Sequence, residues 1–150
     1  MVGGGQGSFI GDVHRRASRI DGMIDLVCGA FSSNPERSLK SAEALGVAPE
    51  RAYKSFEDMI KKEAELPEDE RMDFVSIVTP NHMHFPPAKM ALEYGFHVIC
   101  DKPVTLSLEE AFDLQKVVKE SGKVFALTHN YTGYPMVKQA RLMIQNGELG

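Results

Sequence analysis

Residues 74–103, FVSIVTPNHMHFPPAKMALEYGFHVICDKP, show the pattern that decides the fold. Two short apolar runs, residues 74–79 and 96–100, predict buried strands. Between them, apolar residues at helical spacing predict a helix across residues 88–94. Two strands separated by a helix pair in parallel, because the helix carries the chain back to the starting edge of the sheet. This stretch therefore predicts a strand–helix–strand unit of a parallel sheet.

The same alternation continues on both sides of this unit. Helices are expected over residues 9–20, 34–45, 55–65, 108–120 and 135–145, and strands over residues 24–31, 51–54 and 124–128. Local signals set several bounds, since Asn34 before Pro35 is a helix start and Ser107 with Glu110 is a capping box. The pattern predicts one domain, residues 1–150, of the α/β class: a Rossmann-type, doubly wound parallel sheet. Ligands bind such sheets at the carboxyl ends of the strands.

Bulk composition excludes several classes of protein. Hydrophobic residues make up 43% and charged residues 25% of the 150 residues, as in ordinary globular domains. A formal net charge of −4 and scattered basic residues argue against nucleic acid or a membrane surface as partner. No apolar run approaches the roughly 20 residues of a membrane span. Cys28 and Cys100 lie in apolar runs, which favours two buried thiols over a disulfide and predicts a cytoplasmic protein.

A glycine-rich turn opens the chain: Met1-Val2-Gly3-Gly4-Gly5-Gln6-Gly7-Ser8 leads from the end of an apolar strand into a helix. Glycines let a dinucleotide pyrophosphate approach the backbone, and the helix N-terminus offers free N–H groups. The expected cofactor contacts are Gly3, Gly5, Gln6, Gly7 and Ser8, with Ser8 in the third glycine position of the fingerprint. The alternative is a flexible glycine-rich tail. The strand before the turn is reduced to Met1-Val2, so we expect a truncated first strand.

The end of the second predicted strand bears on which dinucleotide binds. Ser32 and Ser33 stand where an NAD site usually has an acidic residue for the ribose hydroxyls, and Arg37 follows in the next helix. Hydroxyls beside a guanidinium suit a 2′-phosphate, so the sequence leans towards NADP within an NAD(P) assignment. The alternative is that Asn34 caps the helix and Arg37 is solvated.

Polar residues follow the next strand directly. Thr79, Pro80, Asn81 and His84 are expected to contact the nicotinamide end of the cofactor. The alternative is a turn residue at Asn81 and exposed loop histidines at His82 and His84. No metal site is expected, because the His-x-His pair has no further ligand at a usual spacing.

Asp101-Lys102-Pro103 follows the strand after that. A lysine directly after a buried strand is costly unless its ammonium has a use. Asp101 and Lys102 are expected to contact the cofactor, and beside its nicotinamide ring the ammonium of Lys102 would bind a substrate hydroxyl and assist its proton transfer, with Asp101 orienting it. The alternative is a surface salt bridge at the strand end.

These three motifs, in this order and spacing, resemble the glucose–fructose oxidoreductase/inositol dehydrogenase/rhizopine-catabolism (Gfo/Idh/MocA) family of oxidoreductases. The resemblance implies that Lys102 is catalytic, although the family usually has Glu where this chain has Asp101. It implies cofactor contacts at Pro80, Asn81 and His84. Many members have an arginine where this chain has Thr132, which weakens the expected substrate contacts at Asn130, Tyr131 and Tyr134.

The resemblance also implies a second α/β domain, absent from these residues, that supplies further catalytic groups and the contacts of a homo-oligomer. The expected activity is hydride transfer between a nicotinamide cofactor and a sugar, cyclitol or related polyol. This chain alone is expected to be inactive. A non-catalytic dinucleotide-sensing module of the same fold is the main alternative. A methyltransferase fits less well, because it leaves the loops at Asn81 and Lys102 without a use.

Overall fold

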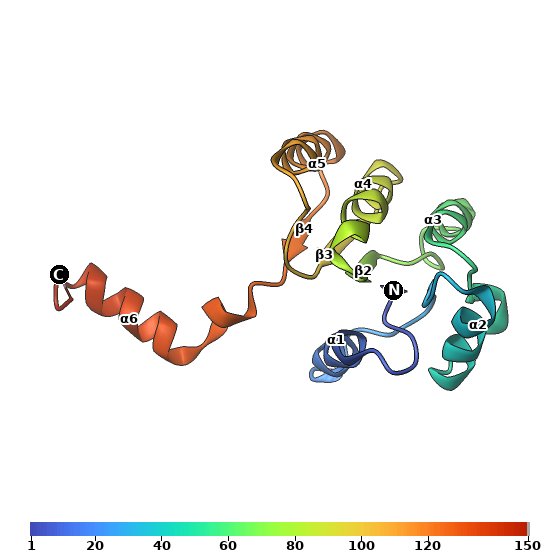
Figure 1. The fold of residues 1–150 in the computed structure, drawn as a ribbon, viewed down its shortest axis with the longest axis horizontal. Coiled ribbons are helices and arrows are strands. Elements are labelled where there is room, and N and C mark those ends of the chain that lie inside the picture. The colour runs from blue at the N-terminus through green and yellow to red at the C-terminus, as the bar shows by residue number, and fades with distance from the viewer. Residues whose placement is uncertain (150) are drawn as a thin grey trace.

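The computed structural model describes residues 1–149 and confirms the parallel α/β class (Figure 1). Its sheet has four strands in the order β1-β2-β3-β4, and every neighbouring pair is parallel. The strands are β1 (Val2–Gly3), β2 (Phe74–Val78), β3 (His97–Cys100) and β4 (Phe125–Leu127). The β2–β3 pairing runs from Phe74 opposite His97 to Ile77 opposite Cys100. The strand–helix–strand unit predicted from residues 74–103 is therefore the centre of the sheet.

Helices cover both faces of the sheet, as doubly wound folds require. In Figure 1, α4 and α5 lie on one side of the strands and α1 lies on the other. The α-helices are α1 (Phe9–Arg19), α2 (Pro35–Ala44), α3 (Phe56–Glu65), α4 (Phe85–Glu93), α5 (Leu108–Ser121) and α6 (Pro135–Gln145). Short 3-10 helices occupy Pro49–Arg51, Asn81–Met83 and Asn130–Gly133.

The predicted helix starts hold where a local cap sets them. The side-chain oxygens of Ser8, Asn34 and Ser107 each accept a hydrogen bond from a backbone N–H in the first turn that follows. Helix α4 begins at Phe85, three residues before the predicted start, because prolines in its first turn fit a helix N-terminus.

The predicted strands at residues 24–31 and 51–54 are wrong. Only isolated bridges form there, between Val2 and Ala30 and between Gly29 and Ala52. A strand needs hydrogen-bonding neighbours, and β1 supplies just two residues, so Ile24 and Val27 have nothing to pair with and remain more than a third exposed. A short first strand was predicted, but its effect on the pairing of residues 24–31 was not.

The main core lies between β2, β3 and the helices α3, α4 and α5. Val75, Ile77, Val98 and Phe96 are at most 1% exposed there. Cys28 and Cys100 are buried free thiols, as expected. None of the helices in residues 1–149 combines the length and apolarity needed to cross a membrane.

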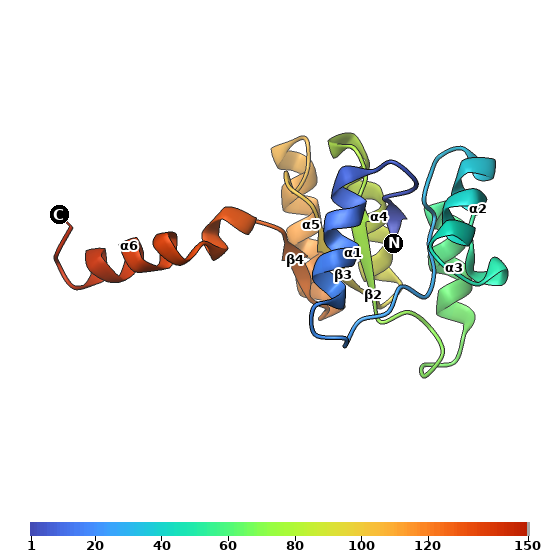
Figure 2. The same ribbon diagram turned by 90° about the horizontal axis from the view of Figure 1, so that it is seen from below.

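Helix α6 differs from the other helices because it extends away from the sheet (Figures 1 and 2). None of its residues is buried, and Met136 is 75% exposed. Its packing contacts are chiefly with the 3-10 helix Asn130–Gly133 directly before it.

Candidate dinucleotide site

A cleft of about 340 Å³ opens at the carboxyl ends of β1 and β2. The glycine turn forms one wall, and residues after Ala30 and after Val78 form the others. Its lining residues are Gly3, Gly4, Gly5, Gln6, Gly7, Ser8, Phe31, Ser32, Arg37, Ser41, Val78, Thr79 and Pro80. Nine of the residues predicted to contact a cofactor thus share one cleft, although they come from three separate segments of the chain.

The glycine turn has a defined backbone conformation and is not a flexible tail. Gly3, Gly4 and Gly7 have φ angles of +76°, +75° and +83°, which other residues rarely adopt. A Cβ on Gly5 would lie 2.8 Å from the Phe31 carbonyl oxygen, so only glycine fits. A Cβ on Gly7 would meet nothing within 4 Å, which leaves the backbone on that side open.

Close packing of α1 against the turn depends on Gly11, which the sequence analysis missed. A Cβ on Gly11 would lie 2.4 Å from the Gly4 Cα, so Gly11, and not Ser8, has the packing role of the third glycine of the fingerprint. Ser8 is instead the N-cap of α1, and its Oγ accepts from the Gly11 N–H at 3.1 Å. The signal in the sequence that could have revealed this role is Gly11 itself, a small residue three positions after Ser8.

Two further residues hold the turn in place and were also missed. The Arg15 guanidinium donates to the Gly4 carbonyl at 2.6 Å, and the Gln6 N–H donates to the Ser41 Oγ at 3.0 Å. Both come from helices that pack on the turn, α1 and α2, so no local pattern in the turn itself reveals them.

The residues expected near the ribose separate into two groups. Ser32 and Arg37 line the cleft, whereas Ser33 does not. Asn34 caps α2 by accepting from the Arg37 N–H at 3.0 Å. The alternative interpretation of Asn34 as a cap is therefore correct, and the Arg37 side chain is exposed at the rim of the cleft.

The loop after β2 places its residues differently from one another. Asn81 and His82 are exposed, whereas His84 is 1% exposed. The His84 Nε2 lies 3.0 Å from the Thr79 carbonyl oxygen, and its Nδ1 lies 2.6 Å from the Pro103 carbonyl oxygen. The expectation of two exposed loop histidines holds for His82 and is wrong for His84, which joins the loop after β2 to the loop after β3.

The loop after β3 leaves Lys102 available. Its side chain is exposed, and within residues 1–149 no ion pair includes it. Asp101 accepts a hydrogen bond from the Thr128 Oγ1 at 2.7 Å, so its described contact is with the end of β4 and not with the neighbouring ammonium. The surface salt bridge proposed as an alternative does not form.

Two further titratable groups, Cys100 and His14, lie close to β2 and β3. Burial, with a contribution from Asp101, raises the pKa of the Cys100 thiol to about 12, which leaves it without nucleophilic thiolate. Burial lowers the pKa of His14, against the attraction of Asp101, and the His14 Nδ1 lies 3.0 Å from the Ser76 Oγ. The Cys100 thiol is therefore not a candidate nucleophile.

Asn130, Tyr131 and Tyr134 lie beyond β4, outside the cleft. The two tyrosine rings contact each other edge to face with centroids 5.7 Å apart, yet they remain 67% and 53% exposed. The three residues therefore lie together in the segment between β4 and α6, apart from the glycine turn.

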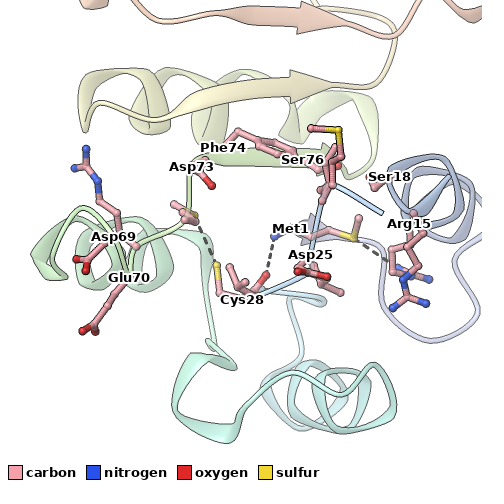
Figure 3. Close-up of a pocket in the computed structure, with 17 residues that line it drawn as sticks. Met1, Arg15, Ser18, Asp25, Cys28, Asp69, Glu70, Asp73, Phe74 and Ser76 are labelled. Carbon is pink, nitrogen blue, oxygen red and sulfur yellow. Dashed lines mark hydrogen bonds between the residues drawn. The ribbon is translucent and has the colours of Figure 1, made fainter. Parts of the chain in front are cut away.

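A second cavity, of about 310 Å³, lies at the opposite, amino ends of the strands (Figure 3). Phe74 and Ser76 of β2 form one side, and residues 24–28 form the other. Met1 lies between them, and its N-terminal ammonium donates to the Cys28 carbonyl at 2.9 Å. This cavity lies between the backbone of β2 and the backbone of residues 24–28. None of the predicted site residues lines it.

Comparison with known proteins identifies the family. Residues 1–140 match the Gfo/Idh/MocA family, described as an oxidoreductase family with an NAD-binding Rossmann fold. The chain belongs to this family. A crystal structure of an oxidoreductase from Sinorhizobium meliloti is 53% identical, with a TM-score of 0.92, and the match covers 100% of this chain and 41% of that one.

Two further relatives carry more specific names. An inositol dehydrogenase homolog from Azotobacter vinelandii, complexed with NAD+, is 41% identical with a TM-score of 0.95, over 100% of this chain and 38% of that one. A levoglucosan dehydrogenase from Pseudarthrobacter phenanthrenivorans is 29% identical over 100% of this chain and 37% of its own length. This chain thus spans roughly two fifths of each of these three relatives.

Proposed function

We propose that these residues are the cofactor-binding part of an NAD(P)-dependent dehydrogenase that oxidises a sugar, cyclitol or related polyol. One observation carries the proposal: the glycine turn, the residues after Ala30 and the residues after β2 line one cleft. Lys102 follows β3, the strand that pairs with β2. The names of the relatives, inositol dehydrogenase homolog and levoglucosan dehydrogenase, support an enzyme over a sensing module.

The cleft fits a dinucleotide pyrophosphate. The backbone beside Gly7 is uncovered, and the N-terminus of α1 lies next to it. We assign Gly3, Gly5, Gln6, Gly7 and Ser8 to the pyrophosphate. Thr79, Pro80 and Asn81 follow β2 and are assigned to the nicotinamide half.

Lys102 is the proposed catalytic residue. When bound, the nicotinamide ring of the cofactor accepts the hydride. The Lys102 ammonium donates a hydrogen bond to the reacting substrate hydroxyl and lowers its pKa, and the hydroxyl proton passes to a base supplied from outside these residues. Asp101, which accepts a hydrogen bond from the Thr128 hydroxyl, precedes Lys102 in this turn. We propose that the groups that bind the rest of the substrate come from outside these residues, so that this chain alone binds cofactor without turning over a polyol.

Binding of NADH by calorimetry tests the proposal. Gln6→Glu places a negative charge at the pyrophosphate position, and we expect it to weaken NADH binding roughly tenfold. Gln115→Glu, on the exposed face of α5, is the matched control and should leave binding unchanged. Equal effects of both variants, or no NADH binding at millimolar concentration, would contradict the proposal.

The rim of the cleft supports a finer proposal, that NADP is accepted at least as well as NAD. Arg37 and Ser32 face the cleft, and a guanidinium pairs well with a phosphate. Arg37→Ala should then lower NADPH affinity roughly tenfold and leave NADH affinity unchanged. A clear preference of the unmodified chain for NADH in parallel titrations would overturn this point and leave dinucleotide binding intact.

A further inference from the structure

Arg15 is a charged residue that contacts the glycine turn from outside the dinucleotide cleft. It lies on α1 and lines the second cavity beside Met1 (Figure 3), and it is not among the residues that line the cleft. Its Nη1 donates to the Gly4 carbonyl at 2.6 Å and lies 3.5 Å from the Met1 sulfur. Gly4 is buried, and within residues 1–149 no other group donates to its carbonyl oxygen.

The peptide group that joins Gly4 to Gly5 is held at both of its polar ends. Arg15 binds its carbonyl, and its N–H, which belongs to Gly5, donates to the Phe31 carbonyl at 3.2 Å. Glycine on both sides leaves this peptide with little steric preference, so the two hydrogen bonds decide its orientation. A buried carbonyl without a partner is costly, and loss of the guanidinium would therefore favour other orientations of the peptide.

The orientation of this peptide matters to an anion in the cleft. Carbonyl oxygens carry partial negative charge, so a turn that binds an anion presents N–H groups to it. Gly4 and Gly5 both line the cleft, and Arg15 holds the Gly4 carbonyl towards α1. We propose that Arg15 is a positioning residue, which keeps this carbonyl away from the pyrophosphate without touching the cofactor. The role in binding rests on the proposed function, whereas the clamp, the hydrogen bond from Arg15 to Gly4, does not.

Arg16 offers a matched control on the same helix. Its guanidinium pairs with the Asp12 carboxylate at 2.7 Å, and its side chain is 81% exposed. An exposed ion pair of this kind contributes little to stability. Arg15→Met and Arg16→Met remove the same charge from neighbouring positions, so a difference between the two variants reports the clamp and not the net charge.

Hydrogen exchange of the Gly5 amide tests the clamp in the absence of cofactor. Arg15→Met should lower the protection of this amide about tenfold, because hydrogen bonds from charged donors are stronger than neutral ones. The Val98 amide, which donates to the Val124 carbonyl in the sheet, should keep its protection. Arg16→Met should change neither amide. Unchanged Gly5 protection in Arg15→Met would refute the clamp, and an equal loss at Val98 would overturn its local role.

Calorimetric titration with NADH tests the positioning role. Arg15→Met should weaken NADH binding about tenfold, and Arg16→Met should leave it unchanged. Equal affinities of the two variants would overturn the positioning role. If Arg15→Met does not fold, Arg15→Gln against Arg16→Gln makes the same comparison with a smaller change.

Arg15→Lys provides a rescue by a conservative variant. A lysine ammonium is also a charged donor on a long side chain, so this variant should recover most of the NADH affinity and of the Gly5 protection. A lysine variant as weak as Arg15→Met in both would contradict the proposal. Absence of NADH binding by the unmodified chain would contradict the proposed function alone, because Gly5 protection reports the clamp without any cofactor.

Discussion

The two sides of β1 differ in how completely the sheet is built. On one side, β2 and β3 pair from Phe74 opposite His97 to Ile77 opposite Cys100, and Val75, Ile77 and Val98 are buried on the same face. On the other side, residues 24–31 have the same apolar, β-branched character, yet only Gly29 and Ala30 form bridges. The comparison teaches that strand propensity is realised only where a neighbouring backbone exists to pair with.

The largest expected effect contrasts one residue from each side. Ile77→Ala removes a fully buried side chain from the centre of β2, and we expect a loss of about 4 kcal/mol of unfolding free energy. Ile24→Ala makes the same change at a residue that is 36% exposed, and it should cost less than about 1 kcal/mol. Urea unfolding of both variants measures the difference. Similar losses of unfolding free energy would mean that residues 24–31 are as well packed as β2.

A buried carboxylate compensates in part for the missing pairing. The Glu63 carboxylate on α3 accepts from the Arg51 guanidinium, the Tyr53 hydroxyl at 2.8 Å and the Met72 N–H at 3.0 Å. It thereby links the segment beside Ala52 to the chain that enters β2. Glu63→Gln should cost about 2 kcal/mol, because it leaves the guanidinium without its charge partner.

The pKa of the Glu63 carboxyl determines how its contribution to stability changes with pH. Burial alone would raise the pKa of the carboxyl, but the hydrogen bonds from Arg51, Tyr53 and Met72 outweigh it and hold the pKa below its ordinary 4.5. A lowered acid pKa stabilises the fold above pH 4.5, and this stability is lost as pH falls below that value. Glu63→Gln should lack that part of the acid transition. An identical acid profile for both chains would contradict the assignment.

Local signals in the sequence predicted the parts of the fold that local chemistry decides. The caps at Asn34 and Ser107 depend on atoms within one helical turn, so the helix starts follow from a few residues. The strand at residues 24–31 failed because its pairing depends on β1, far along the chain. The sequence showed that β1 was short, but a pattern in residues 24–31 alone carries no record of its neighbour.

The candidate site divides in the same way. The glycine turn, Thr79, Pro80 and Arg37 were all found from motifs, because each follows a strand or opens a helix. The contact of His84 with Pro103 was not, since Pro103 lies 19 residues further on. The packing role of Gly11 and the clamp by Arg15 likewise arise only when α1 meets the turn.

Filling the cavity beside Met1 should reduce the difference between the two sides. Since Val2 pairs with Ile77, three residues joined to the Met1 amine would lie beside Val75, Phe74 and Asp73. An extension of three β-branched residues should add about 2 kcal/mol through burial of apolar surface. A Gly-Ser-Gly extension is the control and should add little. Equal stabilities would show that the cavity does not accept a strand.

The smallest expected effect concerns the N-terminal ammonium of Met1. Changing its charge separates the effect of charge from that of packing beside residues 24–28. Burial lowers the pKa of the Met1 ammonium from 8.0, against the attraction of Cys28 and Glu63. Below pH 8 the unfolded chain therefore binds a proton that the folded chain binds less readily, so stability should rise with pH up to about 8, by at most about 1.4 kcal/mol per pH unit. N-terminal acetylation keeps the N–H that bonds Cys28 and removes the charge, so the acetylated chain should show no such rise between pH 6 and about 8. A flat profile for both chains would mean that the ammonium reaches solvent through the cavity. In that case the gain from an extension would come from strand pairing alone.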